Sequence, residues 1–220
     1  MLKRVVQGVV KVMQRFLSAL SLTLLLTGFS AVAQVQQPFT DPIDRVVAAG
    51  LMSRSPDGDF RPNAIMSRAE LASILVRAFR LDLRAPLLAE AAVLQDVPDT
   101  YWASDAIQVV VRTGVMQGYE MGRFFPDQRV NRAEAFSIFA QAYGVSQFPD
   151  ETVDEILAPY PDAEQLPVWA RRSVATAVYA GFVNVDAENQ LNPLQPMTRA
   201  DMAFALSRFL EQQQNPDGRL

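Results

Sequence analysis

Cysteine and histidine are absent from the 220 residues of this sequence. Without cysteine the chain cannot form disulfide bonds, thiolate metal sites or thiol nucleophiles. Without histidine it cannot build a triad with an imidazole base or the common zinc sites. We therefore predict that the protein is not an enzyme, that it has no catalytic residues, and that it needs no metal ion or other cofactor.

Lysine occurs only twice, and both copies lie near the N-terminus. Lys3 and Lys11 stand in a basic region, an uncharged apolar run follows from Phe16 to Phe29, and Ala31-Val32-Ala33 supplies a small-x-small cleavage pattern. These features predict a signal peptide over residues 1–33 and export of the protein. An N-terminal membrane anchor is the alternative, but the run is short for a spanning helix. After cleavage no transmembrane segment is expected.

Positive charge is scarce once that segment is removed. The rest of the chain has 16 arginines against 24 acidic residues, which is a net charge of −8. An acidic surface repels the phosphates of DNA and RNA, so no nucleic-acid partner is expected. Individual arginines can still bind small anionic groups.

The chain contains three copies of one unit, which align on Gly50, Gly114 and Gly181. Eight, ten, twelve and eighteen residues after each glycine, the same or a similar residue recurs. These positions are Gly58, Gly122 and Asn189; Phe60, Phe124 and Leu191; Pro62, Pro126 and Pro193; and Arg68, Arg132 and Arg199. In every copy the arginine is followed by alanine and then by an acid.

Each unit has the pattern of a helix, a loop and a second helix. The glycine ends the first helix because it enters a left-handed C-terminal cap without a steric cost. Ser67, Asn131 and Thr198 cap the second helix, with an acid three positions later as in a capping box. In the third copy this acid is Asp201, and its shorter side chain is predicted to close the box less well.

We assign the units by residue number. Repeat 1 covers 39–82 and is truncated, because it lacks the acidic lead and the tryptophan of the other two. Repeat 2 covers 94–145, repeat 3 covers 159–210, and residues 211–220 are predicted to form a flexible tail.

Repeat 2 carries the fullest match to a known repeat pattern. The matching residues are Asp96-Val97, Trp102-Ala103, Ala106-Ile107, Gly114, Gly118-Tyr119, Gly122, Phe124, Pro126 and Asn131-Arg132-Ala133-Glu134. Over residues 39–210 the chain resembles the S-layer homology (SLH) domain family, in which three tandem repeats are the usual arrangement. The resemblance implies an all-α fold of three helix-loop-helix repeats packed with pseudo-threefold symmetry and with grooves between the repeats.

The resemblance also implies a function. SLH trimers bind an anionic cell-wall polysaccharide non-covalently, typically one that is pyruvylated and linked to peptidoglycan. The chain is therefore expected to be an anchor or adapter of the cell wall or cell envelope, located in the periplasm if the cell has an outer membrane. The alternative is a structural scaffold whose repeats contact an envelope protein partner. A third possibility, an enzyme acting on wall glycan, has little support without histidine, cysteine or an isolated pair of acids.

Arg68, Arg132 and Arg199 are the first candidate ligand-binding residues. Each occupies the first helical position, beside backbone N–H groups that lack partners within the helix. A cation is unfavourable there by helix-dipole reasoning, so its recurrence needs an explanation. The residues alone leave two open: a salt bridge to a neighbouring repeat, or an anion site made by the guanidinium and the helix end. The resemblance implies a ligand role.

Six further positions are candidate ligand contacts: Trp102, Trp169, Asp96, Asp162, Gly118 and Tyr119. A tryptophan that opens an amphipathic helix is more often a core or staple residue, whereas the resemblance implies a place near the ligand groove. The two aspartates could accept hydrogen bonds from sugar hydroxyls or cap turns. The glycine and tyrosine could approach a ligand, although the glycine fits a turn better. Because repeats 1 and 3 depart from the pattern, we expect one or two working sites centred on repeat 2.

Overall fold

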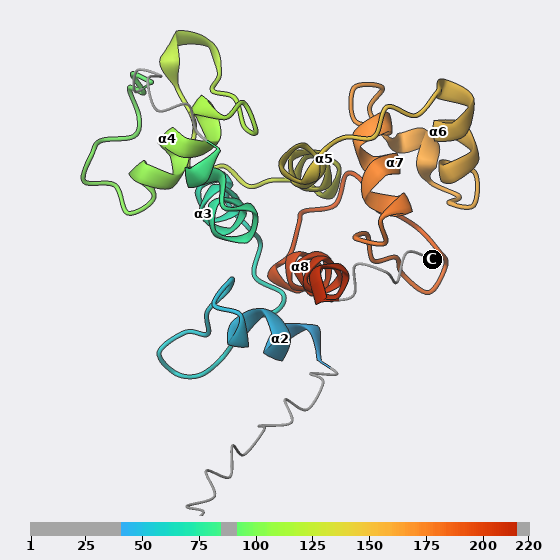
Figure 1. Cartoon of the computed structure of the whole chain (residues 1–220), viewed down its shortest axis with the longest axis horizontal. Coiled ribbons are helices and arrows are strands. Elements are labelled where there is room, and N and C mark those ends of the chain that lie inside the picture. The colour runs from blue at the N-terminus through green and yellow to red at the C-terminus, as the bar shows by residue number, and fades with distance from the viewer. Residues whose placement is uncertain (1–40, 85–91, 215–220) are drawn as a thin grey trace, which may run out of the picture. The chain divides into compact units, whose positions relative to one another are not determined.

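Three helices that begin with the recurring arginine form the inner layer of the fold. They are α3 (Arg68–Phe79), α5 (Arg132–Tyr143) and α8 (Arg199–Gln214). The structure, a computed structural model, describes residues 41–84 and 92–214, all within one compact unit. Figure 1 looks nearly along the inner helices. Aromatic rings join them: Phe79 lies 5.1 Å from Phe139 and 4.6 Å from Phe209, measured between ring centroids.

Three outer helices precede the reference glycines. They are α2 (Pro42–Ala48), α4 (Ser104–Arg112) and α7 (Arg171–Tyr179). Just after each of them the chain turns at Gly50, Gly114 or Gly181, whose φ angles are 70°, 71° and 72°. A side chain would be strained at this left-handed conformation, so the predicted glycine stop is confirmed in all three repeats.

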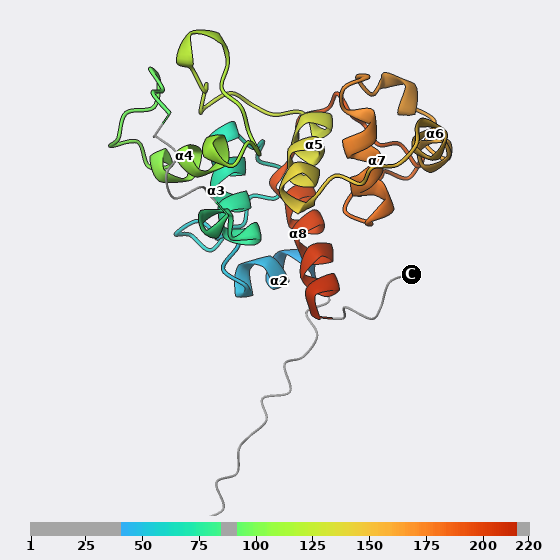
Figure 2. The ribbon, with the colours of Figure 1, turned by 45° about the horizontal axis from the view of Figure 1, so that its top comes forward.

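Each outer helix packs mainly on the inner helix of the repeat before it. Helix α4 of repeat 2 packs on α3 of repeat 1, and α7 of repeat 3 packs on α5 of repeat 2. The circle closes because α2, from repeat 1, packs on α8, from repeat 3. These pairs lie side by side in Figures 1 and 2. A repeat of the sequence is therefore completed only by its neighbours.

A ring of backbone hydrogen bonds lies just before the inner helices. The amide of Met66 donates to the carbonyl of Met197 at 2.9 Å, Met197 donates to Val130 at 2.9 Å, and Val130 donates back to Met66 at 3.2 Å. All three residues are buried. One residue from each repeat, bonded cyclically, marks the pseudo-threefold axis. Within 41–84 and 92–214 there are helices and isolated bridges but no strand, so the predicted all-α architecture of three repeats is confirmed.

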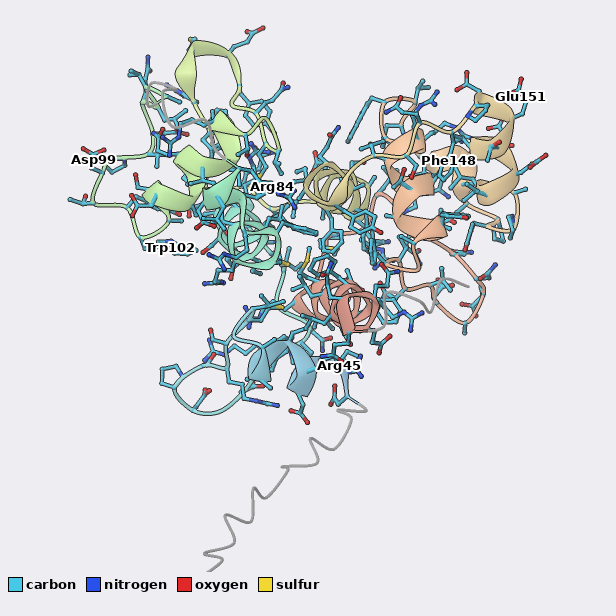
Figure 3. All side chains as sticks on the ribbon, in the orientation of Figure 1. Arg45, Arg84, Asp99, Trp102, Phe148 and Glu151 are labelled. Carbon is cyan, nitrogen blue, oxygen red and sulfur yellow. The ribbon has the colours of Figure 1, made fainter. Side chains whose placement is uncertain are left out.

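The linker between repeats 2 and 3 contains an additional helix, α6 (Asp150–Leu157), which packs on α7. Ion pairs of 2.7 Å between Arg171 and Asp154 and 2.6 Å between Arg172 and Asp150 attach it. Figure 3 shows Glu151 on this helix, away from the inner layer. Three short 3-10 turns complete the structure: η1 (Leu81–Leu83), η2 (Glu120–Gly122) and η3 (Ala163–Gln165).

Two details differ from the sequence predictions. The capping box of α8 closes fully, because the Thr198 amide donates to the Asp201 carboxylate at 3.0 Å and the Asp201 amide donates to Thr198 Oγ1 at 3.2 Å. The prediction of a flexible tail is wrong for residues 211–214, which continue α8. Glu211 holds this last turn by ion pairs with Arg45 and Arg208. Figure 3 shows Arg45 beside α8. Residues 215–220 and the predicted signal peptide, 1–33, lie outside the described residues.

Candidate binding groove between repeats

The recurring arginines have similar surroundings at the starts of the inner helices. Arg68 and Arg132 are buried, with 7% and 6% of their surface exposed, and Arg199 is partly buried. Each guanidinium lies over a phenylalanine ring, with its carbon 4.5, 5.1 or 4.6 Å from the ring centroid. An arginine can stack in this way because its charge is delocalised over a flat, weakly hydrated group.

Each arginine is hydrogen-bonded to the loop of the following repeat. In repeat 2, Arg132 Nε donates to the carbonyl of Leu191 at 2.8 Å and Nη2 donates to the carbonyl of Asn184 at 2.5 Å. The equivalent acceptors are Phe124 and Gln117 for Arg68, and Phe60 and Ser53 for Arg199. Repeat 1 is thus bonded to repeat 2, repeat 2 to repeat 3, and repeat 3 back to repeat 1.

An acidic residue of the following repeat lies near each arginine. Arg132 Nη1 lies 2.8 Å from Asp201 Oδ1, and Arg199 Nη1 lies 3.9 Å from Glu70 Oε1. Burial lowers the pKa of Arg68, while the nearby charges of Tyr119, Glu134 and Asp96 oppose this effect. The inter-repeat salt bridge, one of the two explanations that the sequence left open, is present at Arg132.

The backbone amides at the helix starts already have acceptors. The Arg132 amide donates to Gln195 and the Ala133 amide donates to Pro193, both at 2.9 Å. The same two bonds occur at the starts of α3 and α8, to the loops of the following repeats. The sequence suggested that these amides are free, but they donate to carbonyls of the next repeat. An anion at these positions would therefore have to bind to side-chain donors instead.

Asp201 is the centre of a polar network at the start of α8. Its carboxylate accepts hydrogen bonds from the Thr198 hydroxyl at 2.6 Å and from the Asn184 amide nitrogen at 2.7 Å, in addition to its pair with Arg132. Burial by itself would raise the pKa of Asp201. The hydrogen bonds from Thr198 and Asn184 and the charge of Arg132 outweigh burial and lower it. The carboxylate is thus held in its charged form.

A groove of about 630 Å³ opens beside Arg132 and Asp201. Residues from all three repeats line it, and most of them carry polar groups. They are Ile65, Arg132, Asn184, Val185, Asp186, Asn192, Gln195, Pro196, Thr198 and Asp201. Amide, hydroxyl and carboxylate groups that point into one open space can exchange hydrogen bonds with a ligand that carries many hydroxyls.

Asp96 and Asp162 lie on backbone amides of their own repeats. Asp162 accepts from the amides of Leu191 and Asn192 at 2.9 and 2.7 Å, and Asp96 makes the same two bonds in repeat 2. The second amide belongs to a residue with a left-handed φ of 53° in both repeats, which is unfavourable without glycine. Burial alone would raise the pKa of Asp96, but the hydrogen bonds from these amides outweigh burial and lower it. The two carboxylates therefore hold the loop conformation, although their distances along the sequence from the reference glycine of their repeat differ by one residue.

Trp102 and Trp169 lie outside the core, with 64% and 63% of their surfaces exposed. The expectation that they are core or staple residues is therefore wrong. The ring of Trp102 contacts Tyr101 at a centroid distance of 5.9 Å, and Figure 3 shows it on the α4 side, away from α5. Neither tryptophan lines the groove beside Arg132.

Gly118 and Tyr119 belong to a tight turn of repeat 2. The amide of Tyr119 donates to the carbonyl of Arg123 at 2.6 Å, and a Cβ on Gly118 would lie 3.0 Å from that same oxygen. Glycine is needed here for backbone approach. Tyr119 is 44% exposed, and the Arg68 guanidinium carbon lies 4.8 Å from its ring centroid, so a ring of repeat 2 packs against the recurring arginine of repeat 1.

Of the side chains that line the groove, only Arg132 was predicted from the sequence as a ligand contact. Asn184, Asp186, Asn192 and Gln195 come three, five, eleven and fourteen residues after Gly181. At the first three offsets the repeats carry different residues, and at the fourth Gln195 matches Gln128 but not Ala64, so recurrence does not single these positions out. Recurring positions build the shared frame, and variable positions add further side chains to the groove lining.

Within residues 41–84 and 92–214, no helix is both long and apolar enough to cross a membrane. In that same part of the chain, acidic side chains do not gather in groups of three that could hold a metal ion.

Comparison with known proteins shows the family to which the three units belong. A model of the S-layer homology domain matches residues 29–72, 95–136 and 159–203. The first match begins inside the predicted signal peptide rather than at residue 39. The second and third matches fall on repeats 2 and 3.

The relatives are much longer proteins. A surface-layer 125 kDa protein of Lysinibacillus sphaericus is 30% identical over 78% of this chain and 14% of its own length. A cellulosome-anchoring protein of Acetivibrio thermocellus is 26% identical over 71% of this chain and 34% of its own. An amylopullulanase of Thermoanaerobacterium thermosulfurigenes is 24% identical over 80% and 9%. The chain therefore spans about a third or less of each of these relatives, whose names describe different activities.

Proposed function

Because the chain belongs to the S-layer homology domain family, we propose that it binds an anionic polysaccharide of the cell wall non-covalently and acts as an anchor or adapter of the cell envelope. The polymer would be linked to peptidoglycan, and its acidic substituent would be a pyruvate ketal or a group of similar charge. The names of a surface-layer relative and an anchoring relative support attachment at the cell surface.

The groove beside Arg132 is the observation that carries this proposal. It is open, most of its lining residues carry a polar group, and it is made by three repeats at once, so it exists only when the ring of repeats has closed. The groove offers both donors and acceptors of hydrogen bonds, which suits binding of a hydroxylated polymer. We therefore assign the protein a binding role and not a catalytic one.

A test is co-sedimentation of the purified protein with wall sacculi, before and after acid stripping of the attached polysaccharide. Gln195→Trp should fill the groove. Gln195 is exposed and its side chain makes no hydrogen bond in the described part of the chain, so this substitution should leave the fold intact. Glu151→Trp adds the same bulk on α6. Binding to intact sacculi that is lost on stripping, and lost in Gln195→Trp but not in Glu151→Trp, is the expected result. Equal binding by both variants would exclude this groove.

A structural scaffold is the second candidate, and the bonding of the arginines favours it. Two nitrogens of each guanidinium are hydrogen-bonded to carbonyls of the neighbouring repeat, so their role in packing is complete without a ligand. Absence of binding to both sacculus preparations, with a folded protein, would support contacts to an envelope protein instead.

A further inference from the structure

The lining of the groove beside Arg132 contains more negative than positive charge. Its charged side chains are Arg132, Asp186 and Asp201, so one positive charge against two negative charges leaves −1. The ion pair of 2.8 Å between Arg132 and Asp201 cancels two of these charges. Asp186 is exposed, and in the described part of the chain its carboxylate accepts hydrogen bonds only from uncharged groups. The charge of Asp186 is therefore the one that a ligand meets.

The guanidinium of Arg132 is directed at the protein rather than at the open groove. Nε donates to Leu191 and Nη2 to the carbonyl of Asn184, while Nη1 donates to Asn184 Oδ1 at 3.1 Å and pairs with Asp201. All three nitrogens thus have acceptors, and only 6% of the residue is exposed. An acidic ligand would have to displace these contacts to reach the cation.

Other donors in the lining are also directed at its acids. Asn184 Nδ2 donates to Asp201 and Asn192 Nδ2 donates to Asp186, both at 2.7 Å. This arrangement leaves the Asn192 carbonyl oxygen and the Asp186 carboxylate as acceptors, and Gln195 adds an exposed amide. A hydroxyl can donate to such acceptors, whereas an ionised carboxylate can only accept. The groove therefore suits hydroxyl groups better than acidic ones.

The negative charge of Asp186 is specific to repeat 3. Five residues after the reference glycine, repeats 1 and 2 carry Ser55 and Tyr119. This position lies beside the recurring arginine, since the Tyr119 ring is stacked 4.8 Å from the Arg68 guanidinium carbon. The hydrogen bond from the Gln190 amide makes the largest contribution to a lowered pKa of Asp186, so the carboxylate is charged at neutral pH.

We propose that the groove beside Arg132 accepts an uncharged, hydroxyl-bearing sugar unit and that Asp186 excludes acidic groups from it. A carboxylate in this groove would face Asp186 without an available guanidinium to offset the repulsion, and such repulsion is a common source of specificity. Sugar hydroxyls would instead donate to Asp186 and to the Asn192 carbonyl oxygen. That the sugar belongs to a wall polymer rests on the proposed function, and the acidic substituent of that polymer then lies outside this groove.

The test titrates the purified protein with D-glucose, D-galactose and D-mannose, each compared with its own uronate, and follows the backbone amides by two-dimensional NMR. The members of each pair share a ring and differ by one carboxylate. We expect at least one neutral sugar to shift the amides of Asn184, Asn192 and Gln195. The corresponding uronate should bind about tenfold more weakly, because a like charge faces it.

Two variants assign this difference to Asp186. Asp186→Asn removes the charge but keeps an oxygen that can accept from the amides of Glu188 and Gln190, and Asp186→Ser installs the residue of repeat 1. Both should bind the neutral sugar and its uronate with similar affinity. Glu151→Gln is the matched control, because it removes the same charge from α6, and it should keep the tenfold difference.

Three results would refute the proposal: a uronate that binds as tightly as its neutral sugar, a difference that persists in both Asp186 variants, or lining amides that none of the neutral sugars shifts. Co-sedimentation with sacculi separates this proposal from the wall function. If sacculi bind but the uronates bind as well as the neutral sugars, the wall function stands and the exclusion of acids fails. If sacculi do not bind but the neutral sugars are preferred through Asp186, the reverse holds.

Discussion

Arg132 of repeat 2 and Asp201 of repeat 3 form an ion pair of 2.8 Å that is almost closed to solvent, with 7% and 13% of their side chains exposed. The pair joins the starts of two inner helices, and its arginine also holds two carbonyls of the repeat 3 loop. One side chain thus fixes the distance between two repeats and forms a wall of the groove between them. Packing of the repeats and the proposed binding therefore involve the same residue.

Replacement of this arginine should destabilise the protein strongly. Arg132→Ala leaves a buried carboxylate without its partner and two carbonyls without donors, and removal of one member of a buried pair costs about 3–5 kcal/mol. Urea denaturation at pH 7 measures this loss. Arg54→Ala breaks an exposed pair with Asp44 and should cost about 0–1 kcal/mol. Similar midpoints for the two variants would contradict the structural role of Arg132.

Stability should fall in acid in a way that depends on Asp201. Because its pKa in the folded protein lies below the unfolded value of about 3.9, its charged form stabilises the fold fully above that pH. This contribution is lost as the pH falls through the folded pKa.

The neutral variant Asp201→Asn should therefore be less stable than the wild type at pH 7, and the difference should shrink toward pH 3. Urea midpoints across this range measure the difference. Comparison of the two proteins removes the effect of Asp96 and Asp186, whose pKa values are also lowered. A constant difference would show that Asp201 is not coupled to folding through its charge.

Loss of a central ring should loosen both ends of the described chain together. Phe209 of α8 contacts Phe79 of α3, and α2 packs on α8. Phe209→Ala should cost about 3–5 kcal/mol. Hydrogen exchange followed by mass spectrometry should show faster exchange in α2 and α3 as well as in α8.

A peripheral ring provides the control for this experiment. Phe148 contacts Tyr179 at 5.3 Å beside α6 and α7. Phe148→Ala should raise exchange mainly in those two helices. Faster exchange confined to α8 in the Phe209 variant would mean that the ring of repeats is not one cooperative unit.

The tryptophans should behave as surface residues. Trp102 and Trp169 should both be quenched efficiently by acrylamide, and Trp102→Phe should change the free energy of unfolding by no more than about 0.5 kcal/mol. Blue-shifted emission that resists quenching would contradict their exposure. If wall polysaccharide covers either ring, its addition should reduce the quenching, whereas an unchanged quenching constant would place the ligand elsewhere.

The local structure could be predicted well from the sequence, because local signals specify it. Caps at Ser67, Asn131 and Thr198 begin the inner helices, and glycines end the outer ones, as predicted. The pairing of helices could not be predicted in the same way. Apolar periodicity shows which face of α4 is buried but not that α3, in the preceding repeat, covers it.

The candidate site was only partly predictable for a related reason. Recurrence drew attention to Arg132, but it could not show that carbonyls from another repeat would occupy its donors. It also could not show that Asn184 lines the groove, because the other two repeats carry Gln117 and Ser53 at the same offset. The exposed tryptophans were misjudged because a large aromatic residue at a helix start is usually buried.

Closure of α2 against α8 determines how this architecture can change in evolution. Solenoid proteins lengthen by duplication, since each new unit stacks on an open end. Here the two terminal units already cover each other, so neither end is open. A fourth copy, or the loss of one, would leave an outer helix without an inner helix to pack on. Diversity can then arise at the variable loop positions, where one frame presents three different surfaces.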